Sequence, residues 1–329
     1  MDSTCVCRSW FKKMPAKSGG VVPSLLQNMK MLILAMLCWG HIADGHDEQC
    51  NRGDDTLLRI VISATRSGST ALLHSFANNP SVDVAFHQPI KSGYRENGTF
   101  SYEVFKEESC MSGEGQRVWV AKETIGGFEL PEASFSPLPH TASTLDSVTL
   151  GPWVVSLKAL HRLKPLVLIR DPLQVWNSIS KLNKYSEGKS KYYSPFDYFV
   201  KSYMAVAEFL FAAKENGLPV FAVTQEMLAA NPQEILSRIC DLWGIPYFKS
   251  MVHWTEPYGS KTWFSDEALE RFRSDPRFQL SKAVLTNSTH YDYRPSNPDV
   301  LPEHEEVIEK QLRPLFTKST AMGLADFGG

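Results

Sequence analysis

The chain has 329 residues, which is enough for one sizeable α/β domain with extensions. Its formal net charge is −2, from 34 basic and 36 acidic residues, so nothing in the overall charge favours a nucleic acid as partner. An anionic ligand would therefore have to be bound by a local cluster of basic residues.

Residues 1–55 are expected to be a basic leader, targeting or disordered, ahead of a single folded domain at 56–329. An apolar run from Met31 to Trp39 follows Lys30 and resembles the core of a signal peptide. The run is shorter than the roughly 20 apolar residues that cross a bilayer, so we predict no stable membrane span. The leader leaves two locations open: the cytoplasm, which we favour, and the secretory pathway or Golgi lumen.

The most informative stretch begins with an apolar run, Leu57–Ala64, that is typical of a buried parallel strand. Helical spacing begins at Ala71, and a turn of small residues lies between. Backbone N–H groups converge at such a turn, and the helix end adds roughly half a positive charge. The stretch therefore predicts a phosphate site, and its turn is made of Thr65, Arg66, Ser67, Gly68, Ser69 and Thr70.

This turn differs from the loop of common nucleotide triphosphatases. That loop needs a Lys to reach the terminal phosphates, and here Ser69 stands in its place, while Gly68 is the only glycine. The turn can therefore hold a phosphate but lacks the usual means of transferring one. An ordinary tight strand–helix turn is the alternative interpretation, because glycine and serine favour that too.

The rest of the chain alternates between strand and helix patterns. Further strands are predicted at 82–87, 117–122, 163–169 and 218–223, and helices at 172 onward, 195–216, 232–243, 267–273 and 303–315. Residues 129–150 are rich in Pro, Ser and Thr, and we expect a long surface excursion that could form a substrate lid. The alternation predicts an α/β fold with a doubly wound, mostly parallel sheet flanked by helices.

A second anion site is predicted at the end of the strand at 163–169. The Arg170 guanidinium can donate two parallel hydrogen bonds to a phosphate. Asp171 suits the N-cap of a helix, and Pro172 suits its first position. Ser178 lies about two helical turns further along, on much the same side as Arg170. A simple capping ion pair between Arg170 and Asp171 is the alternative.

These two clusters together resemble motifs of the sulfotransferase family, whose donor is 3′-phosphoadenosine 5′-phosphosulfate (PAPS). Residues 66–70 are similar to the family's 5′-phosphosulfate loop, and residues 168–172 with Ser178 look like its 3′-phosphate motif. A weaker likeness runs from Val223 to Pro246. The resemblance covers residues 57–247 and implies a P-loop nucleotide-binding fold with PAPS as co-substrate.

The predicted donor-binding residues are those of both motifs, namely Arg66, Ser67, Gly68, Ser69, Thr70, Arg170 and Ser178. Backbone N–H groups and the Thr70 hydroxyl would hold the 5′-phosphate. Arg66 would also be catalytic, by neutralising charge on the bridging oxygen as the S–O bond breaks.

A base is needed to take the proton of the acceptor, and His87 is the first choice, because imidazole titrates near neutrality. Glu123 is the second, and Lys122 would supply positive charge to the sulfuryl group. Carbohydrate sulfotransferases have an acidic residue before Pro where this chain has His87-Gln88-Pro89. Cytosolic members have Lys-Thr-His where it has Lys122-Glu123-Thr124.

The sequence thus predicts a metal-independent sulfotransferase that acts on a hydroxyl or amine of a small-molecule or carbohydrate acceptor. Nine histidines without metal-ligand spacing give no metal site. A P-loop kinase is one alternative, although it would need magnesium and the Lys that Ser69 replaces. The other is a nucleotide-binding protein that has lost the chemistry.

Overall fold

The structure is a computed structural model that describes residues 57–89, 117–125, 147–150, 153–156, 163–187, 194–276, 278–279, 285, 288–291, 295 and 297–327. All of them belong to the unit Asp55–Gly329. The predicted leader and most of the predicted excursion at 129–150 lie outside the described residues.

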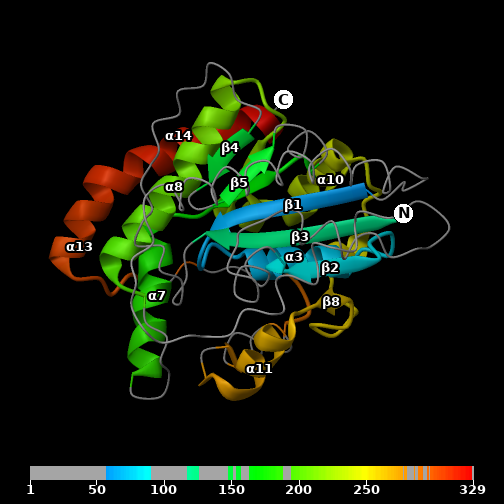
Figure 1. Ribbon diagram of the computed structural model, residues 1–329, viewed down its shortest axis with the longest axis horizontal. Helices are drawn as coiled ribbons and strands as arrows, with labels where there is room; N and C mark the ends of the chain where they lie inside the picture. The colour runs from blue at the N-terminus through cyan, green and yellow to red at the C-terminus, as the bar shows by residue number, and fades with distance from the viewer. Residues whose placement is uncertain are drawn as a thin grey trace, which may run out of the picture. The chain divides into compact units, whose positions relative to one another are not determined.

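A parallel sheet of six strands forms the centre of this unit, with the strand order β7-β6-β1-β3-β2-β8. Figure 1 labels four of these strands, β1, β3, β2 and β8. The sheet confirms the predicted α/β fold. Its strands are β1 (Leu57–Ala64), β2 (Val84–His87), β3 (Val118–Ile125), β6 (Leu166–Ile169), β7 (Phe221–Thr224) and β8 (Thr262–Trp263). A separate antiparallel pair consists of β4 (Ser147–Leu150) and β5 (Trp153–Ser156).

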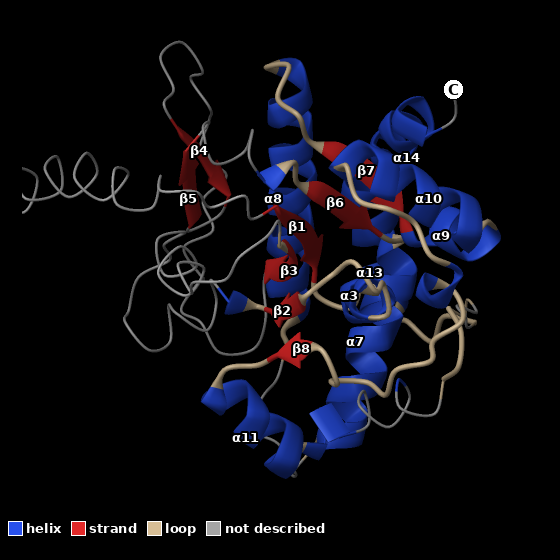
Figure 2. Ribbon diagram, turned by 90° about the vertical axis from the view of Figure 1, so that its right-hand side faces the viewer, coloured by secondary structure: helices blue, strands red, loops and turns tan. Residues whose placement is uncertain are grey.

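Helices lie on both sides of the sheet, as Figure 2 shows. They are α3 (Ser69–Ala77), α7 (Pro172–Ser186), α8 (Phe196–Glu215), α9 (Gln225–Ala230), α10 (Pro232–Trp243), α11 (Asp266–Ser274), α13 (Pro302–Val307) and α14 (Arg313–Phe327). The described residues also form a 3₁₀ turn, η2 (Lys249–Met251), and a π-turn, η3 (Ile308–Leu312).

Five strands of the sheet, β1, β2, β3, β6 and β7, contribute to two separate cores, because successive side chains of a strand point to opposite faces. Ile60 and Ile62 of β1 belong to the core that α7 and α8 cover. Val61, between them, belongs to the core that α3 and α10 cover. This alternation fixes which face each polar residue at the strand ends can reach.

The edge of the sheet at β7 is covered by the C-terminal helix α14, which lies beside it in Figure 2. Asp326 Oδ2 accepts a hydrogen bond from the Ala222 backbone N–H at 2.8 Å, and Asp326 Oδ1 forms an ion pair with Lys214 Nζ at 2.5 Å. Gly323 lets the helix approach closely, since a Cβ there would lie 3.1 Å from the Ala222 carbonyl oxygen. The helix thus satisfies backbone groups that an open edge would expose.

Several predicted elements differ in extent from the observed ones. β3 continues to Ile125 rather than ending at 122, because it pairs with β1 along its whole length. The helix predicted at 303–315 continues through a π-turn to Phe327. Residues 147–150, predicted as part of an excursion, form the strand β4. β8 and α9, with two and six residues, were missed because they are too short to show a period.

Candidate functional site

The site lies where β1 and β6 end side by side and the chain leaves them in opposite directions. After β1 the chain enters α3, which packs in one core, and after β6 it enters α7, which packs in the other. A parallel sheet leaves a crevice at such a switch point, and ligands bind there. The predicted phosphate loop and the corner after β6, formed by Arg170 and Asp171, are therefore neighbours.

Gly68 is the N-cap of α3 and has a φ of 93°, so the first turn of the helix receives no side-chain cap from it. The glycine is required twice over. Its φ lies in the left-handed region, and a Cβ at this position would lie 2.3 Å from Gln225 Oε1. Ser67 and Ser69 are buried beside it. The uncapped helix end and its positive dipole are suited to an anion.

Arg66 joins this loop to the second predicted site. Its Nε donates to Ser178 Oγ of α7 at 3.1 Å, and Arg170 Nη1 donates to the Arg66 backbone oxygen at 2.9 Å. The φ of Arg66 is 64°, an uncommon value for a residue with a side chain and one that concentrates at functional sites. The structure thus brings Arg66, Arg170 and Ser178 together at the crevice.

Two guanidinium groups at one crevice repel each other. Burial lowers the pKa of Arg66 to about 10, and the positive charge of Arg170 acts in the same direction. Arg66 therefore stays protonated at neutral pH, and an anion bound between the two guanidinium groups would be attracted by both and would reduce their repulsion. The residues of the crevice therefore fit a ligand with phosphate groups.

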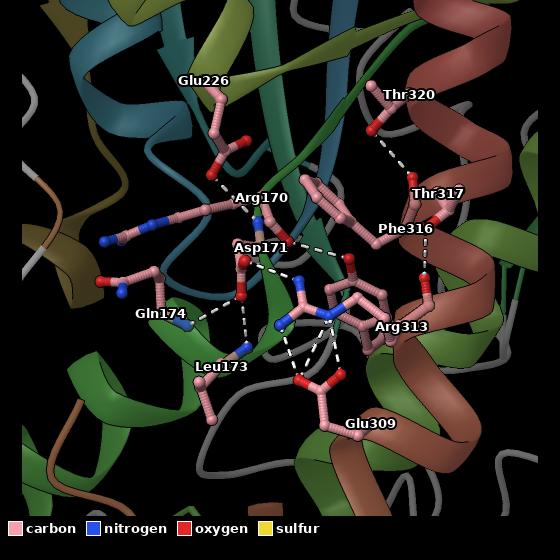
Figure 3. A network of polar contacts seen from close by, with 11 residues as sticks. Arg170, Asp171, Leu173, Gln174, Glu226, Glu309, Arg313, Phe316, Thr317 and Thr320 are labelled. Carbon is pink, nitrogen blue, oxygen red and sulfur yellow. Dashed lines mark hydrogen bonds and ion pairs between the residues drawn. The ribbon is translucent and has the colours of Figure 1, made fainter. Parts of the chain in front are cut away.

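The corner at Arg170 and Asp171 is held by several elements, which Figure 3 shows from close by. Asp171 Oδ1 accepts from the Leu173 and Gln174 backbone N–H groups at 2.8 and 3.3 Å and so caps α7, as predicted. Its Oδ2 pairs with Arg313 Nη1 at 2.6 Å. The predicted cap is confirmed, and Asp171 also forms an ion pair with Arg313.

Lys122 and His87 lie next to each other at the ends of β3 and β2. They are paired in register, so their side chains are on the same face of the sheet, the face that α3 covers. Lys122 Nζ donates to Thr70 Oγ1 at 2.8 Å, and the His87 ring lies 5.1 Å from the Phe264 ring. Lys122 thus contacts the phosphate loop directly, with His87 beside it.

Glu123 lies on the opposite face from both. It is paired in register with Ile62, which packs in the core under α7 and α8, and Glu123 itself is fully buried. The two predicted bases are therefore separated by the sheet.

Three residues of the site were not predicted. Glu226 Oε1 accepts from the Asp171 backbone N–H at 3.1 Å, and burial raises the pKa of Glu226. Tyr203 donates its hydroxyl to the Arg170 backbone oxygen at 2.8 Å. The position of Glu226 directly after β7, at the ligand-binding edge, was a usable signal. Arg313, which lies 142 residues from Asp171, gave none.

Within the part of the chain that the structure describes, no group of acidic, His or Cys residues has the arrangement of a metal site. Over the same residues, no helix combines the length and apolar character needed to cross a membrane.

No protein-family model and no curated protein matches the chain. Its structure is similar to those of several sulfotransferases. For the sulfotransferase domain from the curacin biosynthetic pathway, identity is 14%, coverage is 78% of this chain and 98% of that one, and the TM-score is 0.37. The sulfotransferase from Alicyclobacillus acidocaldarius is 13% identical, with coverage of 83% of this chain and 95% of that one and a TM-score of 0.40. Mouse SULT7A1 complexed with PAP is 13% identical, with coverage of 83% of this chain and 87% of that one and a TM-score of 0.41. These neighbours belong to the family that the two motifs resemble. Since identities and scores are low, the function must follow from the chain's own residues.

Proposed function

We propose that the chain is a sulfotransferase that uses PAPS as donor and requires no metal ion. It would transfer the sulfuryl group to a hydroxyl or amine of a small-molecule or carbohydrate acceptor. The observation that carries this proposal is the meeting of Arg66, Arg170 and Ser178 at the crevice between β1 and β6. A ligand with phosphates at both the 5′ and 3′ positions of one ribose would use both arginines.

Each residue would have a distinct part in holding the donor. The N-terminus of α3 and the Thr70 hydroxyl would bind the 5′-phosphate, and Lys122, already hydrogen-bonded to Thr70, would add positive charge there. Arg170 and Ser178 would bind the 3′-phosphate. Arg66 would stabilise the charge that builds on the bridging oxygen.

In the transfer step the acceptor oxygen or nitrogen bonds to sulfur while the S–O bond to the 5′-phosphate breaks. The electron pair of that bond stays on the phosphate oxygen, and the acceptor proton passes to a base. We assign the base to His87, since it lies on the same face as Lys122 and α3, with Glu123 as the alternative. The products are the sulfated acceptor and 3′-phosphoadenosine 5′-phosphate (PAP).

Thermal shift with three nucleotides tests the donor. We expect PAP and PAPS to raise the melting temperature more than ATP with magnesium, because ATP lacks a 3′-phosphate. Stabilisation by ATP with magnesium alone would favour the kinase alternative instead. Stabilisation by PAP without formation of any sulfated product from a broad acceptor set would favour the inactive nucleotide-binding protein.

Two variants test the residues. Arg170→Ala and Ser178→Ala are expected to reduce the shift caused by PAP, because each removes a proposed contact to the 3′-phosphate. Arg238→Ala is a matched control, since Arg238 forms its ion pair with Glu234 on α10, away from the crevice. An unchanged PAP shift in both site variants would contradict the assignment.

A further inference from the structure

The turn at Arg170 and Asp171 is held by four contacts, two to its backbone and two to the Asp171 carboxylate. The Arg170 carbonyl accepts from Tyr203 of α8, and the Asp171 N–H donates to Glu226 of α9. The Asp171 carboxylate caps α7 through one oxygen and pairs with Arg313 through the other. Three of these restraints are local to the sheet and its adjacent helices, and the fourth comes from the C-terminal helix.

Arg313 is itself held at two ends. Glu309 Oε1 accepts from its Nη2 at 2.7 Å and Glu309 Oε2 from its Nε at 3.1 Å, while Nη1 reaches Asp171 at 2.6 Å. The side chains of Arg313 and Asp171 are 29% and 25% exposed, so water screens this pair only in part. Figure 3 shows the guanidinium between the two carboxylates.

The helix is distorted directly before Arg313. The π-turn η3, Ile308–Leu312, ends one residue before it, and Ile308 and Leu312 are fully buried. A π-turn changes the direction of the side chains that follow and is frequent at functional sites. Its end residues Ile308 and Leu312 pack in the core under α7 and α8, and the next residue, Arg313, contacts Asp171.

We propose that Arg313 is a positioning residue for the 3′-phosphate contact, acting through Asp171 on Arg170. This inference rests on the proposed function, because it assumes that Arg170 binds the 3′-phosphate. A guanidinium that is fixed before the ligand arrives loses less freedom on binding. Arg313 would therefore contribute to donor affinity without touching the donor.

A pair of nucleotides that differ only in the 3′-phosphate separates this role from general stability. Calorimetry should give a dissociation constant for PAP that rises roughly tenfold in Arg313→Gln, the loss expected for one charged hydrogen bond. The constant for adenosine 5′-phosphate should change less than about twofold. Arg313→Lys, which keeps the charge, should lie between wild type and Arg313→Gln.

Two further variants make the outcome decisive. Lys318→Gln on the same helix removes the ion pair with Glu215 and should leave both constants unchanged. The double variant Arg170→Ala/Arg313→Gln should bind PAP no more weakly than Arg170→Ala alone. Equal losses for both nucleotides, or additive losses in the double variant, would overturn the inference while the proposed function stands. If wild type does not prefer PAP over adenosine 5′-phosphate, the proposed function and the inference both fail.

Discussion

Replacement of Gly68 by Ala tests whether the phosphate loop is shaped by its contact with Gln225. The Ala would have to adopt a φ of 93°, which costs about 1–2 kcal/mol in the left-handed region. Its Cβ would also lie 2.3 Å from Gln225 Oε1 and 2.8 Å from Gln225 Cδ. The Gln225 side chain is buried and its Oε1 accepts from the Tyr291 hydroxyl at 2.8 Å, so it cannot swing aside without loss.

The overlap is expected to add roughly 1–3 kcal/mol, the usual cost of overpacking a filled site. Gly68→Ala should therefore destabilise the fold by roughly 2–5 kcal/mol in total. In a Gln225→Ala background the overlap disappears, and the same change should cost only the backbone share of about 1–2 kcal/mol. Denaturant unfolding of the four proteins of this double-mutant cycle measures the difference.

Gly244→Ala is the matched control. Gly244 also has a positive φ, 70°, but a Cβ there meets nothing within 4 Å. Its replacement should cost only the free energy of placing Ala at a positive φ, and this cost should be the same with Gln225 and with Ala at position 225. Equal costs for Gly68→Ala with and without Gln225 would refute the idea that this side chain requires the glycine.

Three other outcomes are expected. His87→Gln should lower kcat by roughly 10²–10⁴-fold, the usual contribution of a general base, and Glu123→Gln should lower it less. A larger loss of kcat in Glu123→Gln would make Glu123 the base instead. Burial lowers the pKa of His74 to about 4, so between pH 6.5 and 4 the unfolded chain binds a proton there that the folded chain does not. The free energy of unfolding should therefore be highest above pH 6.5 and fall by up to roughly 3 kcal/mol as the pH drops to 4. His74→Gln should flatten that slope, and an unchanged slope would contradict the assignment. Burial raises the pKa of Cys240 to about 12, so iodoacetamide at pH 8 should modify its peptide only after denaturation, as mass spectrometry would show.

The features that sequence predicted well depend on local chemistry. The apolar run of β1 and the cap by Asp171 each depend on residues that lie within a few positions of one another. The parallel sheet follows from alternation of strands with helices. The meeting of Arg66 with Arg170 could be expected too, because both follow strands at the ligand-binding edge.

What the sequence did not predict depends on pairing across long separations. The face on which Glu123 lies is set by its register with Ile62 of β1, and no local pattern reveals where β3 stops. The contact of Arg313 with Asp171 spans 142 residues, and Arg313 follows directly after the π-turn η3. Gln225 faces Gly68 only because β7 and β1 end at the same edge of the sheet.

The separation of the two predicted bases by the sheet bears directly on the mechanism. If the N-terminus of α3 and Lys122 hold the transferring group, the acceptor must approach a sulfur that lies above the α3 face. His87 is one strand spacing from Lys122, about 4.8 Å between neighbouring strands, and on that same face. Glu123 would have to act from the α8 side, out of the fully buried position that it occupies. The face that His87 shares with Lys122 is therefore the argument for His87 as the proposed base.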